Sequence, residues 1–159
     1  MVDFCLFDTT RDDDAALRDL ASTTPTLSVN HTDYAPLQLR PIVLGITTAP
    51  PSGDLEATRL RVGEWHRAQW RFLRYIVMQK IAAIEPDEAA LHRLTDEKLR
   101  NLGYIPGVIV QGHRWLLVYS MIQPEPRRVM FWTELEFGST MSIMKSYQRV
   151  SAKDTAIDT

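Results

Sequence analysis

Apolar and β-branched residues gather along the chain in short runs that are bounded by glycine, proline and small polar residues. These runs cover residues 2–7, 41–48, 105–110, 115–121 and 128–134. Short runs of this composition are typical of buried strands. Gly112 and the prolines at 124 and 126 separate the last three runs, so the pattern predicts consecutive hairpins in that part of the chain.

A helical period replaces this pattern between the second and third runs. It predicts one long helix that begins near Asp54, with apolar positions at Leu60, Trp65, Ala68, Phe72, Ile76 and Ile81. Ser52 or Asp54 can cap this helix. A second helix is expected to start at residues 85–87, and residues 95–102 are expected to form a separate turn that Gly103 closes.

Shorter elements are expected toward both ends of the chain. Acids at positions 12–14 precede alanines and leucines up to Leu20, which predicts a helix because the helix dipole favours acids in the first turn. Residues 22–36 are rich in Ser, Thr, Asn and Pro, so we expect a loop, with a short strand at 27–29. Residues 140–150 predict a last helix.

The predicted order of elements is β-α-β-α-α-β-β-β-α. Strands and helices alternate only in part, so the order favours a mixed α/β (α+β) fold with a central mixed β-sheet flanked by helices. We expect a single domain over residues 1–150 and a polar C-terminal tail over residues 151–159.

Composition narrows the classes of function. The 159 residues are 45% hydrophobic and 24% charged, with a net charge of −2 and a pI of about 6.1, so the chain is globular and lacks a basic nucleic-acid footprint. The single cysteine, Cys5, excludes a disulfide framework and a Cys-rich metal site. No apolar run is long enough to span a membrane, and the N-terminus lacks a basic signal region. We expect an intracellular protein, cytoplasmic or nuclear.

Common catalytic motifs are absent from the sequence. It contains no glycine-rich phosphate loop, no HExxH and no GxSxG. His31, His66, His92 and His113 stand singly, so each is expected to be structural rather than a metal ligand. The basic residues near positions 114 and 127–128 are expected to form a solvated turn.

Several segments in a fixed order resemble the fungal PD-(D/E)XK nuclease-like domain proteins. The matching segments are Val2-Asp3-Phe4, residues 25–34 (PTLSVNHTDY), residues 41–48 (PIVLGITT), residues 63–70 (GEWHRAQW), residues 106–115 (PGVIVQGHRW) and residues 137–140 (FGST). The resemblance spans nearly the whole chain. It implies a restriction-endonuclease-like core that cleaves phosphodiesters with a metal.

The resemblance implies a metal site in which an aspartate on one strand and an acid on the next strand hold Mg²⁺. A lysine two residues after that acid would activate or orient the attacking water. Oxygen ligands suit Mg²⁺, and residues i and i+2 of a strand share a face. Asp3 matches the aspartate, whereas Thr47 stands for the acid and Ala49 for the lysine. Arg61 replaces a helix glutamine. We therefore expect no metal, no cofactor and no nuclease activity.

The replaced positions predict a small mixed pocket. Arg61 can neutralise Asp3 in place of the metal, and Glu64 and Trp65 share its helix face. Asp3, Arg61 and Glu64 are the candidate catalytic residues. Cys5, Thr47, Ala49 and Trp65 are the candidate substrate-binding residues. A small organic molecule is the expected partner, and a cofactor-free isomerase or cyclase of a fungal secondary-metabolite pathway is the reaction class that such groups can serve.

Other readings of the same residues stay open. Asp3 and Arg61 can instead form a structural salt bridge. The protein can be a non-catalytic pseudo-nuclease that serves as an interaction module, with an exposed apolar patch or a homodimer interface. A residual nucleic-acid binder is the third reading, which the acidic charge and the missing acid and lysine oppose.

Overall fold

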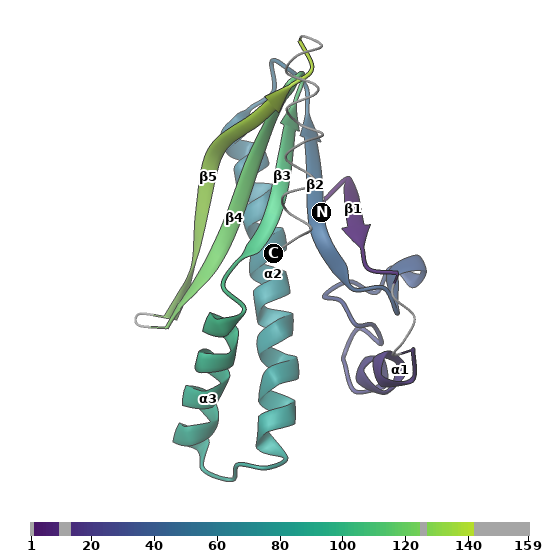
Figure 1. Ribbon diagram of the computed structural model, residues 1–159, viewed down its shortest axis with the longest axis vertical. Helices are drawn as coiled ribbons and strands as arrows, with labels where there is room; N and C mark the ends of the chain where they lie inside the picture. The colour runs from purple at the N-terminus through teal and green to yellow at the C-terminus, as the bar shows by residue number, and fades with distance from the viewer. Residues whose placement is uncertain (1, 10–13, 125–126, 142–159) are drawn as a thin grey trace.

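The computed structural model describes residues 2–9, 14–124 and 127–141, and its centre is a five-stranded sheet in the order β1-β2-β3-β4-β5 (Figure 1). The strands are β1 (Phe4–Phe7), β2 (Ile42–Ala49), β3 (Ile105–Gln111), β4 (Arg114–Pro124) and β5 (Arg127–Ser139). The helices of this part of the chain are α1 (Asp14–Ser22), α2 (Leu55–Ala82), α3 (Glu88–Asn101) and the short 3₁₀ helix η1 (Ala35–Leu37).

The sheet is mixed, as predicted. β2 pairs with β3 in parallel, and every other neighbouring pair is antiparallel. Parallel neighbours need a long crossover, which α2 and α3 provide between β2 and β3. The register places Gly45 of β2 beside Gly107 of β3.

α2 lies across one face of the sheet (Figure 1) and contributes residues to both clusters of the hydrophobic core. Near its start Val62 packs with Ile109, Leu116 and Val118, and farther along Trp70 packs with Leu99 and Ile105. α3 returns beside the second half of α2 (Figure 1). None of the described helices is long and apolar enough to cross a membrane.

The buried face of α2 matches the predicted stripe only in part, because Phe72 and Ile81 are buried as predicted whereas Ala68 is exposed. Leu60 is 71% exposed, whereas Thr58 and His66 are buried together with Trp70. Buried polar side chains are tolerated when they have partners, and Ser120 of β4 supplies one to both His66 and Trp70. The cap was predicted correctly, since Asp54 Oδ1 accepts from the N–H groups of Glu56 and Ala57 at 2.9 and 3.2 Å.

Other boundaries also differ. The turn expected at 95–102 is the second half of a continuous α3, which Asp87 caps and which ends before Gly103 at φ +80°. Residues 27–29 form bends, not a strand. The predicted last helix at 140–150 lies outside the described residues except for the turn at 140–141, and so does the tail at 151–159.

Candidate functional site

Asp3 lies just before β1 and forms hydrogen bonds with β2 through both its main chain and its side chain. Its N–H donates to the Ile46 carbonyl at 3.0 Å, and its Oδ2 accepts from the N–H and the hydroxyl of Thr48 at 2.6 and 3.0 Å. The main-chain groups of Thr48 face this edge beyond the end of β1, so the carboxylate takes the place of a strand partner. These bonds, first the one from the Thr48 N–H, hold the pKa of Asp3 below its usual value.

Arg61 and Asp3 both bind Thr48, but they do not bind each other directly. Its Nη2 donates to the Thr48 carbonyl at 3.2 Å, and its charge contributes to lowering the pKa of Asp3. Among the described residues, no ion pair joins Arg61 to Asp3. The two side chains therefore satisfy the N–H and the carbonyl of one edge residue, and both are exposed.

The paired glycines of β2 and β3 let α2 approach the sheet closely. A Cβ on Gly45 would lie 3.3 Å from Trp65 Nε1, and a Cβ on Gly107 would lie 2.8 Å from His66 Nε2. Two consecutive rings of α2 thus cover the two glycines. His31, from the loop between α1 and β2, packs edge-on against Trp65 with ring centroids 4.2 Å apart.

The two histidines of this cluster are neutral at physiological pH. Burial lowers the pKa of His31 to about 4 and that of His66 to about 4, and for His66 the charge of His31 contributes as well. His66 Nδ1 is 2.9 Å from Ser120 Oγ, which also accepts from Trp70 Nε1 at 2.9 Å. His66 is therefore part of a satisfied core network. His31 Nε2 and Trp65 Nε1, by contrast, are buried without a hydrogen-bond partner.

An open groove of about 650 Å³ lies over His31 and Trp65. One wall is the loop over residues 25–33, and the other is α2 at residues 64, 65 and 68. Glu64 and Trp65 are the sequence-predicted site residues that line it. Sequence reasoning missed His31 as a wall of the site. The signal available was its place in a polar loop that shares the family resemblance with the Trp65 segment.

The loop wall of this groove is held rigidly. The buried Asn30 donates from Nδ2 to the carbonyls of Leu37 and Arg40 at 2.7 and 3.0 Å, and its Oδ1 accepts from the Ile42 N–H at 2.9 Å. Leu27 at the rim adopts φ +51°, a left-handed conformation that is rare for a branched residue. Backbone strain of this kind is typical of functional sites, where the surroundings hold it in place.

A sequence model of one protein family matches residues 1–153, nearly the entire chain. The chain belongs to the PD-(D/E)XK nuclease superfamily. Its mixed sheet with flanking helices is the restriction-endonuclease-like fold of that superfamily, as the sequence predicts. No curated protein and no solved structure matches the chain significantly.

The residues that the sequence resemblance assigns to the superfamily's metal positions do not fit Mg²⁺. Asp3 gives its Oδ2 to Thr48, Thr47 offers one hydroxyl in a fully buried position, and Ala49 offers no donor. Within the described ranges, no three His, Cys, Asp or Glu side chains lie close enough together to hold a metal ion. Cys5 pairs with Gly45 across the strands, and burial raises the pKa of its thiol. Asp3, Cys5, Thr47 and Ala49 thus lie on β1 and β2 or just before β1, and Arg61 reaches Thr48 from α2. None of these five residues lines the groove of Glu64 and Trp65.

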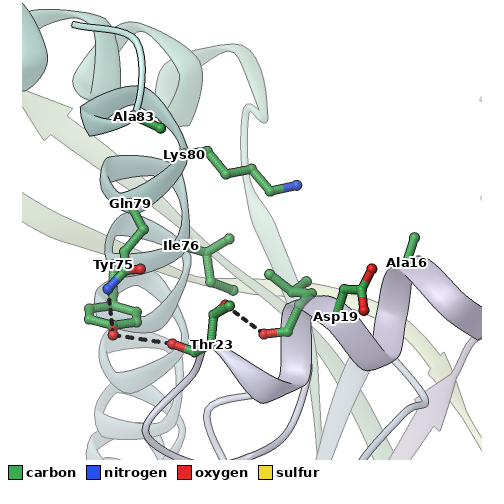
Figure 2. Close-up of a pocket in the computed structure, with 9 residues that line it drawn as sticks. Ala16, Asp19, Thr23, Tyr75, Ile76, Gln79, Lys80 and Ala83 are labelled. Carbon is green, nitrogen blue, oxygen red and sulfur yellow. Dashed lines mark hydrogen bonds between the residues drawn. The ribbon is translucent and has the colours of Figure 1, made fainter.

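A second cavity of about 330 Å³ lies between α1 and the second half of α2 (Figure 2). Its main polar contacts are internal. Tyr75 donates from its hydroxyl to the Thr23 carbonyl at 3.3 Å, and Gln79 Nε2 donates to the Tyr75 oxygen at 2.6 Å. Figure 2 shows these bonds tying the end of α1 to α2. The polar atoms of this cavity hold two elements together, whereas two predicted site residues, Glu64 and Trp65, line the groove, so the groove is the stronger candidate site.

Proposed function

We propose that this PD-(D/E)XK superfamily member has lost metal-dependent phosphodiester cleavage and binds a small organic molecule in the groove over His31 and Trp65. The observation that carries the proposal is the open groove of about 650 Å³, which the His31 and Trp65 rings line together with the Glu64 carboxylate. On the loop wall, His31 Nε2 is buried without a hydrogen-bond partner, which costs about 1–3 kcal/mol.

The chemistry at the former metal positions supports the first half of this proposal. An alanine cannot orient water, and the one remaining carboxylate is tied to the strand beside it. Mg²⁺ requires several oxygen ligands in near-octahedral order. The bonds from Thr48 also keep Asp3 ionised, so it is a poor general acid.

Acid–base chemistry without a cofactor is the reaction class that the groove can serve. Glu64 is an exposed carboxylate on one wall, and the neutral imidazole of His31 lies beside Trp65. A carboxylate base with a neutral imidazole and an aromatic wall is suited to isomerisation or cyclisation of a bound organic molecule. In this proposal Asp3 and Arg61 have a structural role: they bind the main chain of Thr48 on β2, close to the start of α2.

A blocking substitution tests the proposal. Ala68 is exposed on α2 and lines the groove, so Ala68→Trp fills the groove with little effect on the core. Ala82→Trp, exposed at the far end of the same helix, is the matched control. Ligand-observed NMR with a set of aromatic and aliphatic fragments is expected to find binders that Ala68→Trp abolishes and Ala82→Trp retains.

The same preparation is assayed with Mg²⁺ and Mn²⁺ by calorimetry and with DNA and RNA for cleavage. We expect neither metal binding nor cleavage. Metal-dependent cleavage that disappears in Asp3→Ala would overturn the loss of nuclease function. Fragment binding that survives Ala68→Trp would overturn the assignment of the groove.

A further inference from the structure

The charged groups that line the groove are all acidic. Asp33 comes from the loop wall and Glu64 from the α2 wall, so two carboxylates border the groove from opposite sides. None of the described side chains that line it belongs to a lysine or an arginine. Taking the groove as the ligand site, which rests on the function proposed above, we infer that it selects organic cations, namely amines or quaternary ammonium compounds that carry a ring or chain of apolar carbon.

The pairing of Glu64 does not remove its charge from the groove. Arg67 contacts Glu64 at 3.3 Å, but the two side chains are 56% and 73% exposed. An ion pair so open to water is weak, and a long arginine side chain on the outer face of α2 exchanges readily with solvent. Glu64 therefore remains able to attract a cation from the groove side.

The aromatic groups suit the same ligand. Trp65 lines the groove, and an indole attracts a cation placed over its ring face. His31 is the remaining titratable group among the lining residues, and it stays neutral at physiological pH because its pKa is about 4. It therefore adds an aromatic surface without repelling a positive charge.

An anionic ligand meets the opposite conditions. A phosphate or carboxylate in this groove would face Asp33 and Glu64 and would find no positive side chain among the residues that line it. The second cavity differs in this respect, because Asp19 and Lys80 border it with both signs of charge (Figure 2). Selection of one charge type is thus a property of the groove over His31 and Trp65.

Three probes of the same ring and different charge test the inference: phenethylammonium, 2-phenylethanol and phenylacetate. Calorimetry and ligand-observed NMR at pH 7 and low salt are expected to show phenethylammonium binding roughly tenfold more tightly than 2-phenylethanol, with phenylacetate the weakest. Glu64→Gln and Asp33→Asn are each expected to reduce the preference by roughly threefold and to leave 2-phenylethanol unchanged. Glu97→Gln, an exposed acid on α3, is the control that changes nothing.

The outcomes separate the two proposals. Equal binding of the ammonium and the alcohol, with both blocked by Ala68→Trp, overturns the charge selection and leaves the groove as the ligand site. A preference for the ammonium that persists in the Asp33→Asn/Glu64→Gln double variant also overturns it, because the selection then arises elsewhere. Binding of no probe in a manner sensitive to Ala68→Trp argues against both proposals.

Discussion

At the scale of single residues, two glycines decide how the candidate site is built. Gly45 and Gly107 lie side by side in the sheet, and the rings of Trp65 and His66 rest directly on them. A side chain at either glycine would push α2 away from the sheet. This close contact buries Trp65 Nε1 against the sheet, and Trp65 also lines the groove.

Gly107→Ala is expected to lower the free energy of unfolding by about 1–3 kcal/mol, because the new methyl group would lie 2.8 Å from His66 Nε2 and 3.0 Å from Val118 Cγ2. Gly63→Ala is the matched control. It lies inside α2 with open space at its Cβ position, so alanine is expected to raise the unfolding free energy by about 0.5–1 kcal/mol. Urea denaturation measures both, and a Gly107→Ala protein as stable as the parent would contradict the close packing.

The sequence carries only part of this residue-level arrangement. The assignment of Thr47 and Ala49 to the metal positions comes from the family resemblance and stays a prediction, whereas membership of the superfamily is confirmed over residues 1–153. The contact of His31 with Trp65 cannot be read in this way, because it depends on the path of a loop whose bends follow from hydroxyl and amide bonds.

At the scale of elements, the loop between α1 and β2 acts as a preformed wall. Thr24 Oγ1 bonds the carbonyl of Ser28, and Gln38 bonds the carbonyl of Leu27, so side chains rather than a ladder fix the backbone. This is why the short strand expected at 27–29 does not form. Similarly, α3 continues through the turn expected at 95–102 because Thr95 bonds back to the Leu91 carbonyl and Leu99 packs in the core.

Leu27→Gly is expected to keep or raise the stability of the protein while weakening ligand binding in the groove. Glycine removes the cost of φ +51°, about 1–2 kcal/mol, against about 0.5–1 kcal/mol of added chain entropy in the unfolded state. Leu102→Gly is the control, since Leu102 is similarly exposed but has an ordinary φ of −65° and is expected to lose stability. Thermal denaturation and fragment titration measure the two effects. Equal losses in both variants would show that Leu27 is not strained.

The edge of β2 offers a second test at this scale. If the Asp3 carboxylate serves as a strand partner, Asp3→Ala is expected to speed hydrogen exchange at the Thr48 amide by at least about tenfold, because that N–H loses its acceptor at 2.6 Å. Asp33→Ala is the control, since Asp33 lies at the groove and not at this edge. Unchanged exchange at Thr48 in Asp3→Ala would mean that the carboxylate is free to act on a ligand.

At the scale of the whole molecule, the elements that define the superfamily fold are distinct from the residues that line the groove. The parallel pair β2–β3, with its long crossover through α2 and α3, is the part that the order of elements and the family resemblance make predictable. The groove lies instead between α2 and the loop after α1. The proposed function requires no change of fold, because Asp3, Thr47 and Ala49 lie on β2 or just before β1, whereas the groove is lined by the loop over residues 25–33 and by α2.

The free energy of unfolding is expected to depend on pH through His66, which is buried between α2 and the sheet. The folded pKa of His66 is about 4, below the value of about 6.5 expected in the unfolded chain, so only the unfolded chain takes up this proton between these values. The unfolding free energy is therefore at its full value above pH 6.5 and falls by about 1.4 kcal/mol per pH unit for this group as the pH decreases toward 4. His31 acts in the same direction.

Urea denaturation of the parent protein and of His66→Gln at several pH values between 7 and 5 measures this dependence. The parent is expected to show the steeper loss of stability on acidification, by roughly the slope of one proton. If the variant folds too poorly to be compared, NMR titration of the His66 ring protons in the parent decides the point. A His66 signal that titrates near pH 6.5 in the folded protein, or equal slopes in parent and variant, would contradict a buried neutral imidazole between α2 and Ser120.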